Sequence, residues 1–571
     1  MKNKELSEIF NEMADMLEIL GVEWKPQAFR KAARTIEAES NPVEKIYKEK
    51  GEKGLIELDG IGKGIASKII QYIEKGKIDE YEELKKKIPE GVREMLLVHS
   101  LGPKKVSILY QKLGIDSLSK LEKFAKEEKI RKLKGFGEKS EEDILMGLGL
   151  VQKGKERKLM GIILPHAQEL IHQIRKIKNV EKVEIAGSLR RRKETVKDID
   201  IVAFTSNPEK LSEELTHLPN VKGIERKGNN LTSIQLEMGI NADIRILKPE
   251  LYGSGLVHFT GSKEHGIAIR KRAIEKGMKF SEYGLTKNRK IIASQTEEDV
   301  YVKLGLAFIP PEMRENNGEI ELAEKNKLPK LVELKDIKGD LHLHTNWSDG
   351  KNTSEEMVQA CMKKGYEYMA ITDHSKSSHV ANGLDEKRVK QHILELDKLQ
   401  KKYPQIRILK GSEVDILSEG KMDYSNSLLK ELDFVIGSIH SGFKNTSKQM
   451  TERLLGALSN EYVHSIGHPT GRLINQRNPY EFDLEKVLEQ AKEQNKSMEI
   501  NSHPSRLDFN PEIIRDCVEK NVSLAVNTDA HHTNQLDFME LGVSQARRGW
   551  AERKNILNTL SWKEFSKRIG F

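Results

Sequence analysis

The sequence predicts a multidomain protein that combines α+β and α/β parts. The chain has 571 residues, more than a single hydrophobic core usually serves. Residues 1–150 read as successive helices joined by glycine turns, and residues 180–310 mix strand-like and helical patterns. From residue 336 onward, short apolar strands alternate with longer helical segments, which is typical of β/α units.

Composition predicts a cytoplasmic protein without disulfides. The only two cysteines, Cys361 and Cys517, lie far apart and form no metal-binding pair. The chain begins MKNKELSEIF, which lacks the apolar stretch of a signal peptide, and no apolar run approaches the ~18–20 residues that cross a membrane. We therefore expect no membrane association, and we take the protein to be a monomer.

Positive charge is concentrated in the middle of the chain. Residues 151–315 contain 30 Lys and Arg against 22 Asp and Glu, a net charge of +8, whereas residues 1–150 carry +1 and residues 316–571 carry −1. A basic segment of this kind suits a phosphate-rich partner. A basic surface without such a partner explains the charge alone about equally well.

Three glycine turns in the N-terminal region predict contacts to a phosphate backbone. They are LDGIGKGIASKI (58–69), HSLGPKKVSIL (99–109) and LKGFGEKSEEDIL (133–145), and a helical stretch follows each turn. Glycines let the backbone approach closely, and N–H groups at a helix start can bind phosphate. The set resembles helix-hairpin-helix motifs, which hold DNA without reading its sequence. We assign DNA binding to Gly60, Gly62, Gly102, Gly135 and Gly137.

Three aspartates in the middle segment predict a two-metal site. Asp198 and Asp200 are two residues apart on an apparent strand, DIDIVAF, so their carboxylates face one way. Asp243 lies in a second strand-like run, NADIRIL. Carboxylates on adjoining strands can bind a pair of Mg²⁺ ions, which would activate a 3′-hydroxyl and stabilise a pyrophosphate leaving group.

A glycine–serine turn precedes these aspartates by about ten residues. Gly187 and Ser188, with Arg190 and Arg191 close behind, suit the triphosphate of a nucleotide. A D-x-D pair alone is weak evidence. The combination of a G-S turn, D-x-D and a later strand aspartate is fairly specific for nucleotidyltransferases.

Longer motifs resemble a known polymerase family. GSLRRRKETVKDIDIV, NADIRIL, HFTGSKEHGIAIRKRAIEKGMKFSEYGL and TEEDVYVKLGLAFIPPEMREN are similar, in that order, to the palm and thumb of family X DNA polymerases. With AFRKAA and the first two hairpins, the resemblance covers about residues 1–315. It implies Mg²⁺ or Mn²⁺ on the three aspartates, and gapped or primer–template DNA and dNTPs as partners. The nucleotide contacts it implies are Gly187, Ser188, Arg191, Phe259, Gly261 and Arg270.

The same resemblance gives expectations for five other positions. Lys68 falls where lyase-active family members keep their Schiff-base lysine, although a lysine in a basic helix is usually only solvated. Arg30 and Lys31 would contact the 5′-phosphate of a gap. Two residues depart from the family pattern: His258 replaces a common tyrosine, and Gly266 replaces an asparagine that contacts the incoming base. These replacements predict a working but weak polymerase, with a raised KM for dNTPs and relaxed sugar selection.

Candidate metal ligands follow the apolar strands of the C-terminal segment. His342 and His344 alternate with leucines, so both imidazoles can lie on one face of a strand. The other candidates stand where strands stop, and the strand ends of a β/α barrel meet on one face. Any one of them alone would more often be structural. Together the nine candidates provide enough ligands for two or three metal ions. The candidates are His342, His344, Asp349, His374, Glu413, His440, His468, Asp529 and His531.

A second resemblance covers residues 336–571. DLHLHTNWSDG, ITDHS, GSEVD, GSIHSG, GHPTGR, EINSHPSRLD and TDAHHT resemble the polymerase-and-histidinol-phosphatase (PHP) domain. It implies a distorted, TIM-like β/α barrel with metal-dependent phosphoesterase activity. The absence of cysteine ligands leaves Zn²⁺, Mn²⁺ and Fe²⁺ open, and we expect Zn²⁺ and/or Mn²⁺. Arg506 and Lys376 would contact phosphate, unless they are simple surface residues.

Together the two resemblances predict a bacterial or archaeal family X DNA polymerase for gap filling in repair, with 3′–5′ exonuclease or phosphoesterase activity in its PHP domain. The main alternative is a DNA 3′-end nuclease or phosphatase whose polymerase core only binds DNA. A histidinol-phosphate-type phosphatase and a non-catalytic scaffold are further alternatives. The predicted parts are a lyase-like domain (1–90), a fingers-like domain (91–150), a palm (151–252), a thumb (253–315), a linker (316–335) and the PHP domain (336–571).

Overall fold

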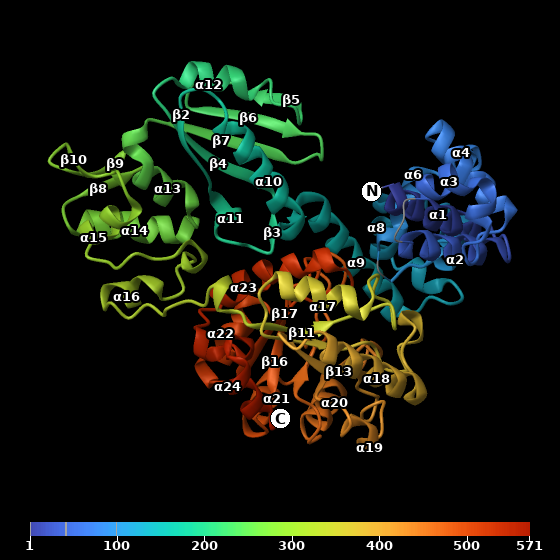
Figure 1. Ribbon diagram of the computed structural model, residues 1–571. Helices are drawn as coiled ribbons and strands as arrows, with labels where there is room; N and C mark the ends of the chain where they lie inside the picture. The colour runs from blue at the N-terminus through green and yellow to red at the C-terminus, as the bar shows by residue number, and fades with distance from the viewer. Residues whose placement is uncertain (1, 40–42, 99) are drawn as a thin grey trace. The chain divides into compact units, whose positions relative to one another are not determined.

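In the computed structural model, which describes residues 2–39, 43–98 and 100–571, the chain divides into two units (Figure 1). The helical unit comprises residues 1–155 with 475–478, and the second unit comprises 156–474 and 479–571. His99, the first residue of the second predicted hairpin, lies outside the described residues.

The described part of the helical unit consists of helices and turns without strands. Apolar residues at helical spacing, such as Leu6, Phe10 and Met13, are fully buried, and Phe10 packs edge-on against Phe29. The helices are α1 (Lys2–Ile19), α2 (Lys25–Ala38), α3 (Val43–Ile56), α4 (Lys63–Lys75), α5 (Asp79–Lys87), α6 (Glu90–Glu94), α7 (Pro103–Leu113), α8 (Leu118–Lys126) and α9 (Glu138–Glu156).

The second unit begins with a five-stranded mixed sheet. Its strands are β2 (Val180–Ile185), β4 (Asp198–Thr205), β7 (Asn241–Leu247), β6 (Leu231–Leu236) and β5 (Val221–Arg226), in that spatial order. Strands β4 and β7 run parallel, and the other neighbours are antiparallel. Helices α10 (Met160–Arg175) and α12 (Pro208–Leu215) contribute apolar side chains to the core that this sheet shares.

A smaller helical and hairpin region follows the sheet. It contains α13 (Tyr252–Thr260), α14 (Lys263–Glu275), the strands β8 (Lys279–Ser281), β9 (Gly284–Lys287) and β10 (Lys290–Ala293), and α15 (Glu297–Lys303).

The segment 316–335, expected to be a linker from its polar composition, contains helix α16 (Glu319–Glu324). Glu319 is fully buried and accepts hydrogen bonds from the backbone N–H groups of Asn316 and Asn317, with His265 Nδ1 2.7 Å away. Ile320 also joins the core of the preceding region. Glu319 therefore belongs to a buried hydrogen-bond network, and the polar composition of the segment does not indicate that burial.

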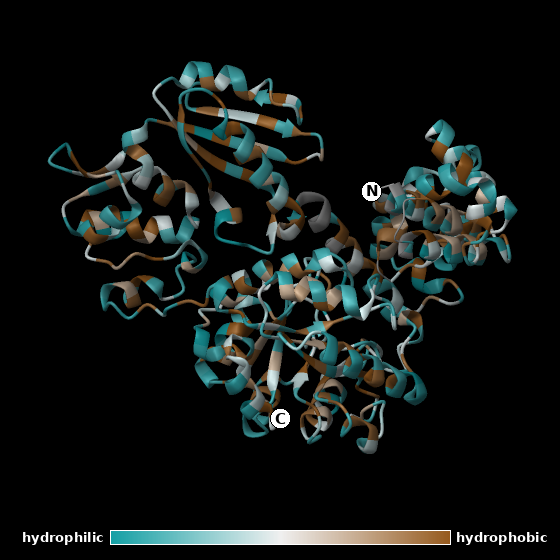
Figure 2. Ribbon diagram, in the orientation of Figure 1, coloured by the Kyte–Doolittle hydropathy of each residue, from teal (hydrophilic) through white to brown (hydrophobic). Residues whose placement is uncertain are grey.

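The C-terminal part is a parallel β/α barrel. Its strands follow one another in chain order: β11 (Gly339–Leu343), β12 (Tyr368–Ile371), β13 (Arg407–Asp415), β14 (Phe434–Ser438), β15 (Ser465–Ile466), β16 (Ser497–Asn501) and β17 (Ser523–Asn527). Leu343 also bridges to Ala530, just beyond β17, so the barrel is nearly closed. Most of the strand residues are buried, and Figure 2 shows apolar segments along them.

Helices alternate with the barrel strands along the chain. The longer ones are α17 (Ser354–Lys363), α18 (Glu386–Lys402), α20 (Ser447–Leu458), α21 (Leu484–Glu493), α22 (Pro511–Lys520), α23 (Met539–Arg548) and α24 (Trp562–Ile569). The sequence-based expectation of a β/α barrel from residue 336 is confirmed. Over the described ranges, no helix is both long and apolar enough to pass through a membrane.

Candidate active sites

The three predicted palm aspartates lie on one face of the five-stranded sheet. Asp200 on β4 stands beside Asp243 on β7, and Asp198 is two residues before Asp200 on the same strand. Burial, together with the negative charges of Asp198 and Asp243, raises the pKa of Asp200 to about 7. A divalent cation between these carboxylates would relieve both effects, so the residues fit a Mg²⁺ or Mn²⁺ site.

Two glycines shape the surroundings of this carboxylate face. Gly187 has φ +55°, and a Cβ at this position would lie 1.8 Å from the Asp200 carboxylate, so only glycine fits. Gly261 has φ +69°, and a Cβ there would lie 3.0 Å from Nη1 of Arg191. Ser188 follows Gly187 in the short helix α11 (Gly187–Arg190) and is partly exposed. Gly187 therefore lies directly against Asp200, and Gly261 lies beside Arg191.

The two predicted phosphate arginines are both engaged by carboxylates. Arg190 forms two hydrogen bonds with Glu297 (2.9 and 2.6 Å) and one with the Thr260 hydroxyl (2.6 Å). It therefore joins the palm to the following region rather than standing free for a triphosphate. Nε of Arg191 donates to Glu315 (3.1 Å), and its Nη1 donates to the Thr260 carbonyl.

Aromatic and basic residues lie further along the same region. His258 packs edge-on against Phe259, with ring centroids 4.8 Å apart, and burial lowers the pKa of His258. A Cβ on Gly266 would lie 3.4 Å from Nη1 of Arg270, which is ordinary contact distance. An asparagine at Gly266 would thus fit beside Arg270.

The predicted DNA contacts of the helical unit are also paired with acids. Lys68 lies 3.0 Å from one carboxylate, Arg30 is 2.7 Å from each of two, and Lys31 is 2.9 Å from another. Lys31 is the most exposed of the three, at 51% of its side chain. A DNA phosphate would have to displace these acids, which are Glu80 for Lys68, Asp15 and Glu18 for Arg30, and Asp59 for Lys31.

The five predicted turn glycines precede helices as expected. Gly62 and Gly102 are the N-cap residues of α4 and α7, and Gly137 stands immediately before α9. Gly60 and Gly135 have φ values of +72° and +92°, which only glycine adopts readily. Each turn thus leaves backbone N–H groups at a helix start.

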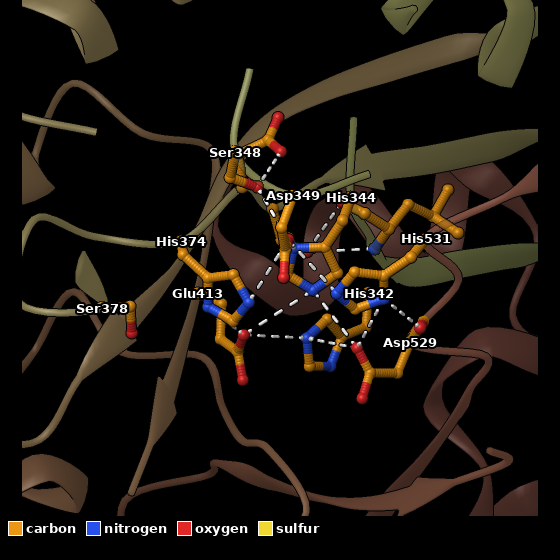
Figure 3. A network of polar contacts seen from close by, with 12 residues as sticks. His342, His344, Ser348, Asp349, His374, Ser378, Glu413, Asp529 and His531 are labelled. Carbon is orange, nitrogen blue, oxygen red and sulfur yellow. Dashed lines mark hydrogen bonds and ion pairs between the residues drawn. The ribbon is translucent and has the colours of Figure 1, made fainter. Parts of the chain in front are cut away.

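The nine predicted barrel ligands gather at the carboxyl ends of the strands, and Figure 3 shows how His342, His344, Glu413 and Asp529 point toward one another. Three groups of side chains bring ligand atoms within 4.8 Å of one another: His344, Asp349, His374 and His531; His342, His344 and Asp529; and His374, Glu413 and His440. Among the residues that the structure describes, these are the only such groups, so the palm aspartates converge less closely than the barrel ligands.

Glu413 stands at the centre of the barrel ligands. Its Oε2 lies 2.8 Å from His374 Nδ1, and its Oε1 lies 2.9 Å from His468 Nε2 and 3.3 Å from His440 Nε2. The same carboxylate is 3.5 Å from Nε2 of His342. One carboxylate oxygen thus faces His374 and His342, and the other faces His468 and His440.

Buried polar atoms at this centre support metal binding. Nε2 of His342, both ring nitrogens of His344 and both carboxylate oxygens of Glu413 are buried without a well-directed hydrogen bond. Unsatisfied buried groups are costly, and cations would satisfy all of them. Burial, with neighbouring histidines, lowers the pKa of His344 to about 4, which keeps the imidazole in the neutral form that binds metal.

Two carboxylates behind the ligands were not predicted. Oε1 of Glu499 on β16 lies 2.7 Å from Nδ1 of His342, and Oδ1 of Asp415 lies 2.6 Å from Nδ1 of His440. Such partners fix the orientation of ligand imidazoles. The sequence held a signal for both, because Asp415 is two residues after Glu413 on one strand and Glu499 interrupts the apolar strand SMEIN.

We expect Glu499→Gln to lower metal affinity and barrel activity by about 10- to 100-fold, because His342 would lose the acceptor that orients it. Metal titration followed by a phosphoesterase assay measures both quantities. Glu493→Gln, an exposed position on α21, is the matched control. Unchanged affinity in Glu499→Gln would refute this role.

Seven of the nine barrel ligands, all except His342 and His344, line a cavity of about 470 Å³, a size that suits a nucleotide. Arg506 also lines it, with Nε 3.7 Å from Asp529 Oδ2. Lys376 is 43% exposed and lies 3.7 Å from Glu386, and it is not among the cavity-lining residues. Arg506 is therefore the better placed of the two predicted phosphate contacts.

Comparison with protein families gives four matches along the chain. Two helix-hairpin-helix families match residues 1–78 and 92–149, the second as a SAM-like tandem. The DNA polymerase beta thumb matches residues 255–315, and the PHP domain matches residues 340–503. The chain is 41% identical over 569 residues to the DNA polymerase/3′-5′ exonuclease PolX of Bacillus subtilis (strain 168). This match covers 99% of this chain and 98% of that protein. The chain belongs to the family X DNA polymerases.

This family X polymerase also has shorter relatives. It is 32% identical over 211 residues to a probable phosphatase of Caldicellulosiruptor bescii, and the match covers 35% of this chain and 83% of the relative. A probable phosphatase of Thermoanaerobacter sp. (strain X514) is 32% identical over 231 residues, 38% of this chain and 89% of its own length. The predicted combination of a family X core with a PHP domain is confirmed.

Proposed function

We propose that the protein is a DNA polymerase that fills gaps during DNA repair and trims 3′ ends in its barrel. The observation that carries the proposal is the presence of two separate clusters of metal-binding type on two separate sheets. One is the aspartate face on β4 and β7, and the other is the ligand cluster at the barrel strand ends. Full-length similarity to a polymerase/3′-5′ exonuclease supports this pairing of activities.

In the polymerase half, Asp198, Asp200 and Asp243 would hold Mg²⁺ or Mn²⁺, which supplies charge stabilisation at the primer hydroxyl and the leaving pyrophosphate. Ser188 and Arg191 would bind the triphosphate of a dNTP. Phe259, Gly261 and Arg270 complete the proposed nucleotide site, and the hairpin glycines of the helical unit hold gapped or primer–template DNA.

In the barrel half, the nine ligands would hold two or three ions of Zn²⁺ and/or Mn²⁺, which supply a polarised water and charge stabilisation for phosphoester hydrolysis. Glu413 would be one of the ligands that hold these ions, and Glu499 and Asp415 would keep His342 and His440 oriented. Arg506 would hold the scissile phosphate in the cavity.

A second candidate is a DNA 3′-end nuclease whose polymerase core only binds DNA. It is favoured by the tighter convergence of the barrel ligands compared with the palm aspartates. Lyase activity of Lys68, the six-part domain division, a monomeric state and a cytoplasmic location stay predictions.

One assay separates the two candidates. The protein is incubated with a gapped, 5′-labelled primer–template and Mn²⁺, with and without dNTPs. We expect the primer to grow with dNTPs and to shrink without them. A primer that only shrinks under both conditions would support the nuclease candidate and overturn the polymerase assignment.

Two substitutions are expected to improve dNTP use. Gly266→Asn restores a side chain that can hydrogen-bond a base edge, worth ~0.5–1.5 kcal/mol net, and His258→Tyr restores the family's aromatic residue. The double mutant should show roughly a 2- to 12-fold gain in kcat/KM for dNTPs, with trimming unchanged. Steady-state gap filling measures this, and an unchanged kcat/KM would show that these positions do not limit the polymerase.

A further inference from the structure

Helix α23 of the barrel contacts the palm residues that follow the glycine–serine turn. Nη1 of Arg548 donates to the backbone carbonyl of Arg191 at 2.7 Å. Nη2 of Arg192 donates to Glu540 at 2.7 Å, and Nε2 of Gln545 donates to the Arg192 carbonyl at 3.2 Å. Three side chains of one barrel helix thus hold the backbone of two consecutive palm residues and the side chain of Arg192.

Arg548 and Arg191 also share one carboxylate. Oε1 of Glu315 accepts from Nη1 of Arg548 and from Nε of Arg191, both at 3.1 Å. The Arg548 side chain is only 5% exposed. Burial opposes ionisation of Glu315, but Arg191, Arg548 and Lys193 together lower its pKa, so the carboxylate is charged. One mostly buried anion therefore holds two guanidinium groups.

This arrangement decides how easily Arg191 can bind a triphosphate. Glu315 and an incoming triphosphate compete for the same guanidinium. When Arg191 turns to the phosphates, Glu315 keeps Arg548 as a partner and is not left as an uncompensated buried charge. Without Arg548, Lys193 at 3.8 Å would be the remaining cation, and Arg191 would be held more tightly by Glu315.

We propose that Arg548, a residue of the PHP barrel, is a positioning residue for nucleotide binding in the palm. It anchors the Arg191 backbone and neutralises Glu315, which leaves the Arg191 guanidinium available to the triphosphate of a dNTP. The proposal rests on the proposed role of Arg191 in the polymerase site. It makes the barrel a structural part of the polymerase, in addition to any activity of its own.

The test is Arg548→Met in the full-length protein, measured by steady-state single-nucleotide gap filling and by 3′ trimming. We expect the KM for dNTP to rise about 10-fold, equivalent to about 1.4 kcal/mol, while kcat and trimming stay within about twofold. Arg548→Lys should recover part of the loss. Adding Glu315→Gln to Arg548→Met should recover most of it, because no charged carboxylate then competes for Arg191.

Arg547→Met is the matched control on the same helix, since Arg547 binds Glu312 and the Val332 carbonyl instead. It should leave the KM for dNTP unchanged. An unchanged KM in Arg548→Met, or a loss of both activities that Glu315→Gln does not reverse, would overturn the positioning role. If Arg548→Met does not fold, a KM in Arg548→Lys equal to that of the wild type would overturn it. Absence of incorporation by the wild type would instead overturn the proposed polymerase function, and the positioning role with it.

Discussion

Asp198→Ala is expected to abolish primer extension and to leave 3′ trimming intact. The substitution removes one of the three carboxylates on the face formed by β4 and β7. Mutating a residue that only hydrogen-bonds a metal ligand typically lowers metal affinity or activity by about 10- to 100-fold. Because Asp198 is itself a proposed ligand, we expect primer extension to fall by at least about 100-fold. Extension and trimming are measured on the same labelled gapped primer. Glu209→Ala, an exposed acid of the same domain, is the control.

The reverse outcome is expected for His344→Ala. Its imidazole is fully buried and belongs to two of the three ligand groups of the barrel. Trimming should fall by at least about 100-fold, with extension retained, whereas His217→Ala at an exposed position should change neither. Loss of both activities in Asp198→Ala would count against two independent active sites.

Glu297→Gln is expected to lower the free energy of unfolding of the second unit by about 3–5 kcal/mol, because it removes the shared partner of two arginines. Glu297 is buried and binds Arg190 in the palm and Arg314 at 2.7 Å. Arg314 is fully buried, so its positive charge would be left without compensation. Chemical denaturation measures the difference.

The effect of Glu297→Gln depends on pH in a defined direction. Arg314 and Arg190 lower the pKa of Glu297 below its ordinary 4.5, despite burial. A lowered carboxyl pKa contributes stability that is complete above about 4.5 and is lost as pH falls through the folded-state value. The wild type should therefore lose its advantage over the variant in acid. Glu298→Gln, an exposed neighbour, should change stability by less than about 0.5 kcal/mol at any pH.

The barrel and its ligands were predictable because each signal is local. Strand period placed His342 and His344 on one face, and the strand-end rule gathered ligands from widely separated segments. The structure brings eight of the nine into three close groups, and His468 joins them through Glu413. The sequence signal for the helix-hairpin-helix turns is also local. Gly60, for example, has a positive φ that favours glycine at that position.

The roles of the arginines could not be read in the same way. Arg190 and Arg191 stand beside the G-S turn, which suggested phosphate binding, but their carboxylate partners Glu297 and Glu315 lie more than a hundred residues away in sequence. A long-range ion pair leaves no periodic or spacing signal. For the same reason, the sequence does not predict the contact between Arg548 and the palm.

A primer with a blocked 3′ end tests most directly the claim that the chain holds two independent active sites. On a gapped template with dNTPs and Mn²⁺, the wild type should first trim the blocked primer and then extend it. Asp198→Ala should trim without extending, His344→Ala should do neither, and a mixture of the two variants should restore extension. Extension of the blocked primer by His344→Ala alone, or no trimming by Asp198→Ala, would contradict the assignment.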